Sequence, residues 1–126
     1  MTLRINRYPI FWVWTIAGKC LPKTQGKFHE GLSRVCLDQT WIRNAAMNFL
    51  FITDLTALEK ESGPRGYRKV LMESGRMGRR IYLAAQGLGC CGVGALYDRE
   101  ARSLMGLDPE TALFYLISTG PVKRSF

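Results

Sequence analysis

The longest regular pattern in the sequence lies between Tyr67 and Gln86, where apolar residues recur at the spacing of a helix. The expected apolar face consists of Val70, Ser74, Met77, Ile81, Ala84 and Leu88, widened by Leu71, Tyr82 and Ala85. Gly75 and Gly78 lie inside this helix, where each costs about 1 kcal/mol relative to alanine. Small residues on a helix face allow close approach, most often of another helix, and here that helix could belong to a partner subunit.

The remaining pattern predicts strands and short helices around this long helix. Compact apolar runs predict buried strands at residues 48–53 and 113–118, and residues 90–96 read as a glycine-rich strand. A further strand is expected at residues 8–17, with loops at 18–27 and 61–66. A helix is expected from Phe28 to Leu37, followed by a helical piece at 41–46 with Asp38 as its cap. A last short helix is expected to begin at its cap Asp98, run to Met105 and end at Gly106. One α+β domain over residues 1–126 is the simplest interpretation.

The N-terminal stretch allows a second interpretation. Arg4 and Arg7 precede an apolar run at residues 9–17, an arrangement also found in signal peptides. The run is too short to span a bilayer, and Gly18-Lys19-Cys20 is a poor cleavage site. Its aromatic and β-branched residues favour a strand over an export signal or a membrane contact.

Cysteine spacing argues against a metal site. Cys20, Cys36, Cys90 and Cys91 form no C-x-x-C pair, and His29 has no ligand partner nearby, so no bound metal is expected. Adjacent cysteines rarely bridge each other, so reduced thiols in a cytoplasmic protein are the expectation.

The charge balance of +8 suggests an anionic partner or a solvated basic helix face. The densest basic cluster contains Arg65, Arg68, Lys69, Arg76, Arg79 and Arg80. Nucleic acid is not expected as the partner, because no zinc-finger, RNA-binding or helix-turn-helix pattern accompanies the charge. Membrane binding is not expected either.

Three glycines, Gly89, Gly92 and Gly94, follow the long helix at its junction with the glycine-rich strand. They form neither a dinucleotide fingerprint nor a phosphate-binding loop, because the strand–turn–helix context and the Lys-Ser/Thr pair are missing. Glycines within a strand leave space for a tight bend, for close packing or for a ligand. From the residues alone, these glycines could serve either a tight turn with close packing or contact with a ligand.

Taken in order, several stretches resemble the FMN-dependent nitroreductase superfamily, closest to its branch of azoline-oxidising dehydrogenases from peptide-antibiotic clusters. The resemblance covers about residues 28–126. The matching stretches are Cys36-Leu-Asp-Gln-Thr-Trp41, Phe49-Leu-Phe-Ile-Thr-Asp-Leu55, Arg65-Gly-Tyr-Arg68, Leu71-Met-Glu-Ser-Gly75, Ile81-Tyr-Leu-Ala-Ala85, Gly87-Leu-Gly-Cys-Cys-Gly-Val-Gly-Ala95, Leu104-Met-Gly-Leu-Asp108 and Leu113-Phe-Tyr-Leu-Ile-Ser-Thr-Gly-Pro121.

The resemblance implies an α+β fold with a central mixed sheet flanked by helices and one long helix near a homodimer interface. It also implies FMN as cofactor, with NAD(P)H and a small organic acceptor as reactants. Gly92, Val93, Gly94 and Ala95 match the segment that runs beside the flavin, where an N–H of Gly94 or Ala95 would face flavin N5. Lys123 and Arg124 match the position of a basic residue on the FMN phosphate. No side chain is assigned a catalytic role.

The chain also departs from this family's pattern. It lacks the Arg-Ser-x-Arg segment that grips FMN, since Arg4-Ile-Asn-Arg7 has no serine, and the lysine–tyrosine motif of azoline oxidation is not recognisable. The domain therefore looks N-terminally shortened, and a dimer or another chain would supply the missing flavin contacts. Arg76, Arg79 and Arg80 replace the usual His, Gln and Asn.

Three interpretations follow. The first is a nitroreductase-like flavin oxidoreductase, the second a non-catalytic relative that acts as a structural or interaction subunit, and the third a basic protein that binds another anion such as nucleic acid.

Overall fold

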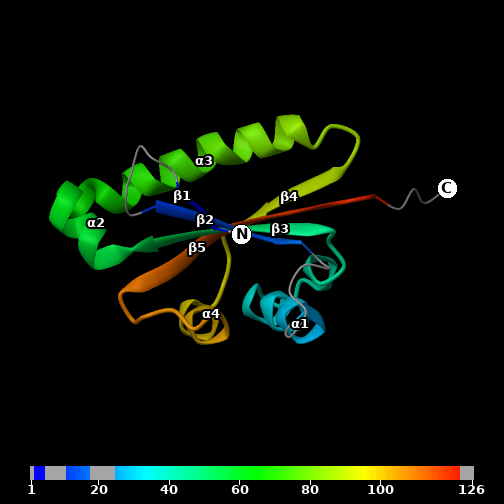
Figure 1. Ribbon diagram of the computed structural model, residues 1–126, viewed down its shortest axis with the longest axis horizontal. Helices are drawn as coiled ribbons and strands as arrows, with labels where there is room; N and C mark the ends of the chain where they lie inside the picture. Colours follow the sequence, from blue (N-terminus) through cyan, green and yellow to red (C-terminus); the bar gives the residue numbers. More distant parts are fainter. Residues whose placement is uncertain (1, 5–10, 18–24, 123–126) are drawn as a thin grey trace.

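A five-stranded antiparallel sheet with helices on both faces forms the centre of the molecule (Figure 1). The computed structural model describes residues 2–4, 11–17 and 25–122. The elements are β1 Thr2–Arg4, β2 Phe11–Ala17, α1 Gln25–Val35, the 3-10 helix η1 Thr40–Ile42, β3 Met47–Asp54, α2 Leu55–Ser62, the 3-10 helix η2 Gly63–Arg65, α3 Gly66–Ala84, β4 Gly89–Val93, α4 Asp98–Met105 and β5 Thr111–Gly120.

The strand order is β1-β2-β3-β5-β4, which places β4 at an edge of the described sheet. The predicted α+β class and the long helix are confirmed, but the expected mixed sheet is wrong for the strands that the structure describes. All four of their pairings are antiparallel. The reason is visible between β4 and β5: the segment that contains α4 returns the chain to the end of the sheet at which β4 finishes, so β5 runs back along β4.

Two hydrophobic clusters fill the space between the sheet and its helices. Helices α1 and α4 cover one face, and α2 and α3 cover the other (Figure 1). The first cluster contains Leu32, Val35, Cys36, Ile42, Leu50, Val93, Ala101, Leu113 and Leu116. The second contains Phe51, Leu58, Val70, Phe114 and Ile117. An irregularity in the β3–β5 register between Phe51 and Ile52 lets Phe114 join Phe51 on the α3 face, where the two ring centroids lie 6.5 Å apart.

Helix α3 has a narrower buried face than the pattern predicts. Gly66, Val70, Ser74 and Gly78 are buried, whereas Leu71, Tyr82 and Leu88 are exposed. Gly78 allows close approach, but the neighbour is the sheet rather than another helix: a Cβ there would lie 3.0 Å from Ile117 Cδ1 of β5. Gly75 is exposed, and a Cβ there would meet no atom within 4 Å among the described residues.

The two capping predictions for aspartates are wrong. Asp38 does not cap a helix at 41–46, because its φ is +56° and only the short η1 forms, with Gln39 as its N-cap. Asp98 is the first residue of α4, whose N-cap is Tyr97. Helix α2 was not predicted at all, and Asp54 caps it by accepting the Ala57 N–H at 2.9 Å.

Several element boundaries agree with the sequence analysis. The strand expected at 8–17 is observed over Phe11–Ala17, and Gly106 ends α4 as its C-cap with a φ of +63°. Helix α3 ends at Ala84 with Ala85 as its C-cap, and Gly87 adopts a φ of +85° in the turn that follows. Helix α1 begins at Gln25, inside the expected loop.

In the described part of the chain, no helix combines the length and the apolar character needed to cross a membrane.

Candidate functional site

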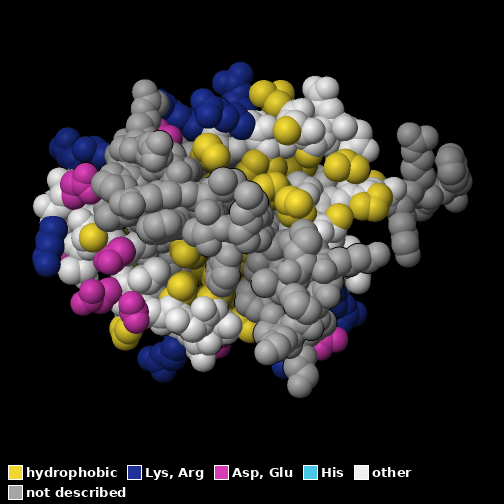
Figure 2. All heavy atoms as spheres, in the orientation of Figure 1, with side chains coloured by type: hydrophobic (Ala, Val, Ile, Leu, Met, Phe, Trp, Pro, Cys, Tyr) yellow, Lys and Arg dark blue, Asp and Glu magenta, His cyan; other side chains and the backbone are white. Residues whose placement is uncertain are grey.

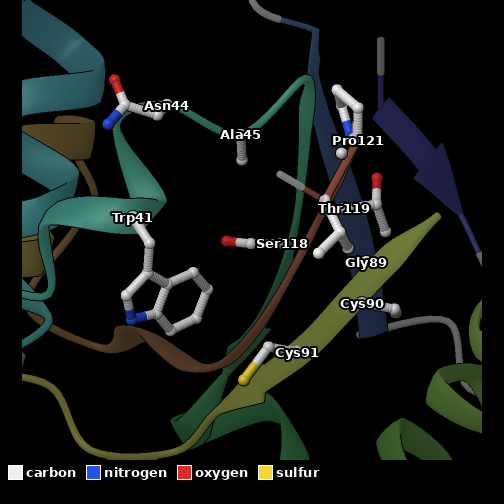
Figure 3. A pocket seen from close by; sticks show the side chains of 11 residues that line it. Trp41, Asn44, Ala45, Gly89, Cys90, Cys91, Ser118, Thr119 and Pro121 are labelled. Atoms are coloured by element: carbon white, nitrogen blue, oxygen red, sulfur yellow. The ribbon is translucent and has the colours of Figure 1, made fainter. Parts of the chain in front are cut away.

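A cavity of about 520 Å³ opens between η1, the start of β4 and the end of β5 (Figure 3). Its walls are Trp41, Asn44, Ala45, Gly89, Cys90, Cys91, Ser118, Thr119, Gly120, Pro121 and Val122. In Figure 3 the Trp41 indole and the Cys91 sulfur stand on opposite sides of the cavity, and the Ser118 side chain enters it above them. The cavity thus combines an aromatic wall with thiol, hydroxyl and backbone groups.

A buried polar pair fixes the wall of η1 against the sheet. The Ser118 hydroxyl donates to Asn48 Oδ1, and Asn48 Nδ2 donates to the Ile42 carbonyl oxygen at 3.4 Å. Asn48 is fully buried, so these bonds compensate for the loss of its hydration. The Ala46 N–H also donates to the Thr119 carbonyl oxygen at 2.9 Å. The segment carrying Trp41 is therefore held by both β3 and β5.

The neighbouring cysteines of β4 lie on opposite faces of the sheet. Cys90 packs against the cluster under α3, whereas the Cys91 sulfur turns toward the cavity (Figure 3). Burial, followed by the neighbouring Cys91 thiol, raises the pKa of Cys90. Burial also raises the pKa of Cys36 to about 11, which keeps that thiol protonated and unreactive at neutral pH. Cys36, Cys90 and Cys91 are free thiols. Within the described residues, no three His, Cys, Asp or Glu side chains form a group that could hold a metal.

Gly92, in the predicted cofactor segment, is enclosed by two tyrosines. Its N–H donates to the Tyr82 hydroxyl oxygen at 2.8 Å, and a Cβ at Gly92 would overlap the Tyr115 hydroxyl. Burial raises the pKa of Tyr115, with smaller contributions from nearby Tyr82, Cys91 and Cys90. Packing inside this chain is therefore sufficient to require glycine at position 92.

The next three predicted residues differ in what they present to a ligand. The Val93 side chain is buried in the core, so only its backbone could contact a ligand. Gly94 and Ala95 follow the last residue that pairs with β5 and are exposed. A Cβ at Gly94 would meet no atom within 4 Å, so the space beside it is open.

The predicted phosphate contacts, Lys123 and Arg124, lie outside the described residues. In the sequence they directly follow Val122, which lines the cavity. The structure therefore places the start of β4 and the residue before Lys123 in one cavity, and the predicted segment 92–95 begins in β4 and continues beyond its end.

The sequence analysis missed the aromatic and hydroxyl walls of this cavity. Trp41 and Ser118 were noted only as part of resembling stretches, because neither belongs to a motif whose spacing reports chemistry. The contact of Tyr82 with Gly92 was also missed, since helical periodicity places Tyr82 on a face but does not show what it meets.

Comparison with known proteins identifies the fold and the family. Residues 13–120 match the Nitroreductase family. A protein of Methanocaldococcus jannaschii assigned as a nitroreductase is 35% identical over 79 residues, which cover 61% of this chain and 39% of that protein.

Two solved structures share the fold. A crystal structure from Anabaena variabilis, assigned as a nitroreductase, superimposes with a TM-score of 0.79 at 25% identity and covers 91% of this chain and 28% of that chain. The NADPH:FMN oxidoreductase of Vibrio harveyi, solved with NAD⁺, superimposes with a TM-score of 0.73 at 17% identity. The match covers 98% of this chain and 55% of that chain.

The chain thus spans well under two thirds of the length of these relatives, while the family match extends over most of its own residues. The elements that form the cavity, from η1 through β4 and β5, all fall inside that match. The chain belongs to the nitroreductase family.

Proposed function

We propose that this chain is a nitroreductase-like flavin oxidoreductase of the cytoplasm, built as one domain over residues 1–126. It binds FMN in a site shared across a homodimer or with another chain. Family membership supports the reaction class, and a solved structure of the same fold is an NADPH:FMN oxidoreductase. Within the family, the resembling stretches taken together, including residues 36–41, favour the azoline-oxidising branch as the nearest.

The observation that carries the proposal is that the cavity wall leads into one predicted cofactor segment and includes Val122, the residue that precedes the other in the sequence. One contact segment, residues 92–95, continues the wall formed by residues 89–91, and the other follows Val122 directly. A strand rises about 3.3 Å per residue, so β4 is long enough to run beside an extended nucleotide-like ligand. Open space at Gly94 suits a flat ring, and the hydroxyl and backbone groups of residues 118–120 suit a polar arm.

Each part of the chain then has a defined task. The N–H of Gly94 or Ala95 would donate toward the ring edge, and Lys123 and Arg124 would hold the phosphate with charge-assisted hydrogen bonds. Trp41 supplies an aromatic wall that excludes water from one side of the cavity. When bound, FMN supplies hydride transfer between NAD(P)H and an organic acceptor.

A titration that compares FMN with riboflavin tests this assignment, because riboflavin lacks the phosphate. We expect the purified chain to bind FMN and to reduce an organic acceptor when NADH or NADPH is added. The double variant Lys123→Ala/Arg124→Ala should lose about tenfold or more in FMN affinity, with riboflavin affinity unchanged. The double variant Arg34→Ala/Lys60→Ala removes the same charge from exposed positions of α1 and α2 and should leave both affinities unchanged.

Failure to bind any flavin, alone or with a partner chain, would favour the second candidate, a non-catalytic structural or interaction subunit. One observation supports that candidate: the Tyr115 hydroxyl already explains why position 92 is glycine, so the glycine-rich strand is partly a packing feature. An equal loss of FMN and riboflavin affinity in the Lys123→Ala/Arg124→Ala variant would reject the contact of these residues with the phosphate. It would leave the proposal of flavin binding standing.

A further inference from the structure

A single hydrogen bond joins the last turns of α3 to the free edge of the described sheet. The Tyr82 hydroxyl oxygen accepts the Gly92 N–H at 2.8 Å. Tyr82 is 43% exposed, so the bond lies at the surface, where a ligand can reach it. Gly92 belongs to β4, the edge strand, whose outer side has no strand neighbour among the described residues.

The direction of this bond determines which backbone groups of β4 face outward. Because Gly92 donates to Tyr82 rather than to β5, its N–H points away from the sheet. Backbone groups along an extended chain alternate in direction with a period of two residues. Strand β4 ends at Val93. A backbone that stayed extended for two more residues would point the Gly94 N–H to the outer side and the Ala95 N–H away from it.

The Tyr82 hydroxyl keeps a second hydrogen-bonding function. A phenol donates one proton and accepts through its lone pairs, and the Gly92 bond uses only a lone pair. Within the described residues, the recorded bond of Tyr82 is the one from Gly92, so its proton is available to a ligand at the β4 edge.

Tyr115 supports the same strand from the face of the sheet. Its hydroxyl lies against Gly92, where a Cβ would otherwise stand. Its ring is tilted against Phe51, with ring centroids 5.5 Å apart. Gly92 is therefore held by one tyrosine at its N–H and by another at its Cα, which restrains the strand just before Gly94.

We propose that the Tyr82 hydroxyl has two roles: it holds the β4 edge so that the Gly94 N–H faces a bound flat heteroaromatic ring, and it donates its own proton in a hydrogen bond to an acceptor atom on that ring. The inference rests on the proposed function, since FMN is the ring considered. It adds a side-chain role to a site for which the sequence indicated only backbone contacts.

The test compares Tyr82→Phe with Tyr97→Phe, which removes a hydroxyl from another tyrosine of similar exposure. In the flavin-free protein, Tyr82→Phe should speed amide exchange at Gly92. In the flavin-bound protein, it should weaken FMN binding by about three- to tenfold and make the midpoint potential of bound flavin more negative. Thermal unfolding should stay close to wild type, and Tyr97→Phe should change none of these quantities.

The outcomes separate the two proposals. Wild-type protein that binds FMN, together with a Tyr82→Phe variant of unchanged affinity and potential, would overturn the role of Tyr82 and leave the proposed function standing. An unchanged rate of amide exchange at Gly92 in Tyr82→Phe, measured without flavin, would by itself overturn the role of the Tyr82 hydroxyl in holding β4. A wild-type protein that binds no flavin, either alone or with a partner chain, would overturn both the proposed function and the contact of Tyr82 with the ring.

Discussion

Gly92 and Gly94 are two residues apart in the chain and meet different surroundings. At Gly92 the missing side chain makes room for the Tyr115 hydroxyl, whereas at Gly94 the space is open. The sequence could show that a glycine-rich strand leaves room for something. It could not show that Tyr115 fills the room at one position, because that contact joins residues far apart in sequence.

Alanine substitutions distinguish the two glycines. Gly92→Ala should lower the free energy of unfolding by about 1–3 kcal/mol, because the added methyl overlaps the Tyr115 hydroxyl in a packed region. Gly94→Ala should change stability by no more than about 0.5 kcal/mol but should weaken FMN binding. Urea denaturation and FMN titration measure the two effects. Equal destabilisation by both variants would contradict this difference.

For helix α3, the sequence could predict the length of the helix but not the width of its buried face. The apolar periodicity predicted its length well, because a helix that packs on a sheet repeats its buried side every three to four residues. The same periodicity could not give the width of the buried face. Leu71 and Tyr82 are exposed, whereas α3 contributes Val70, Met77 and Ile81 to the cluster beneath it.

Short elements carried too little pattern to be predicted. Helix α2 has eight residues and η1 has three, so neither repeats an apolar face often enough to stand out. Asp54 is a typical N-cap, but in the sequence it could equally end the preceding strand. The cavity wall that carries Trp41 could not be predicted for the same reason.

The two glycines of α3 give a prediction for this element. Gly75→Ala should raise the free energy of unfolding of the single chain by about 0.5–1 kcal/mol, because alanine favours the helix and meets no atom there. Gly78→Ala should gain less or lose stability, since its methyl would press on Ile117 Cδ1 at 3.0 Å. Urea denaturation of both variants at low protein concentration measures the difference, and a larger gain for Gly78→Ala would contradict it.

At the scale of the whole molecule, the sheet order and the distribution of charge govern assembly. Apolar runs predicted where strands lie but not their order or direction, because pairing is set by how the connecting helices pack. The sequence could therefore indicate the strand at Leu113–Ser118 without showing that β5 lies between β3 and β4. Figure 2 shows Lys and Arg side chains gathered over α3, where Glu73 pairs with Arg76 at 3.2 Å.

This charge makes the salt dependence of assembly informative. If two copies associate through α3, light scattering should report twice the 14.3 kDa of one chain, and the dimer should tighten as salt rises. The reason is that the basic side chains of the two helices repel each other and salt screens that repulsion. An acidic partner chain would show the opposite trend, because salt screens its attraction. A mass of one chain at every salt concentration would reject the homodimer and leave a second polypeptide as the source of the remaining flavin contacts.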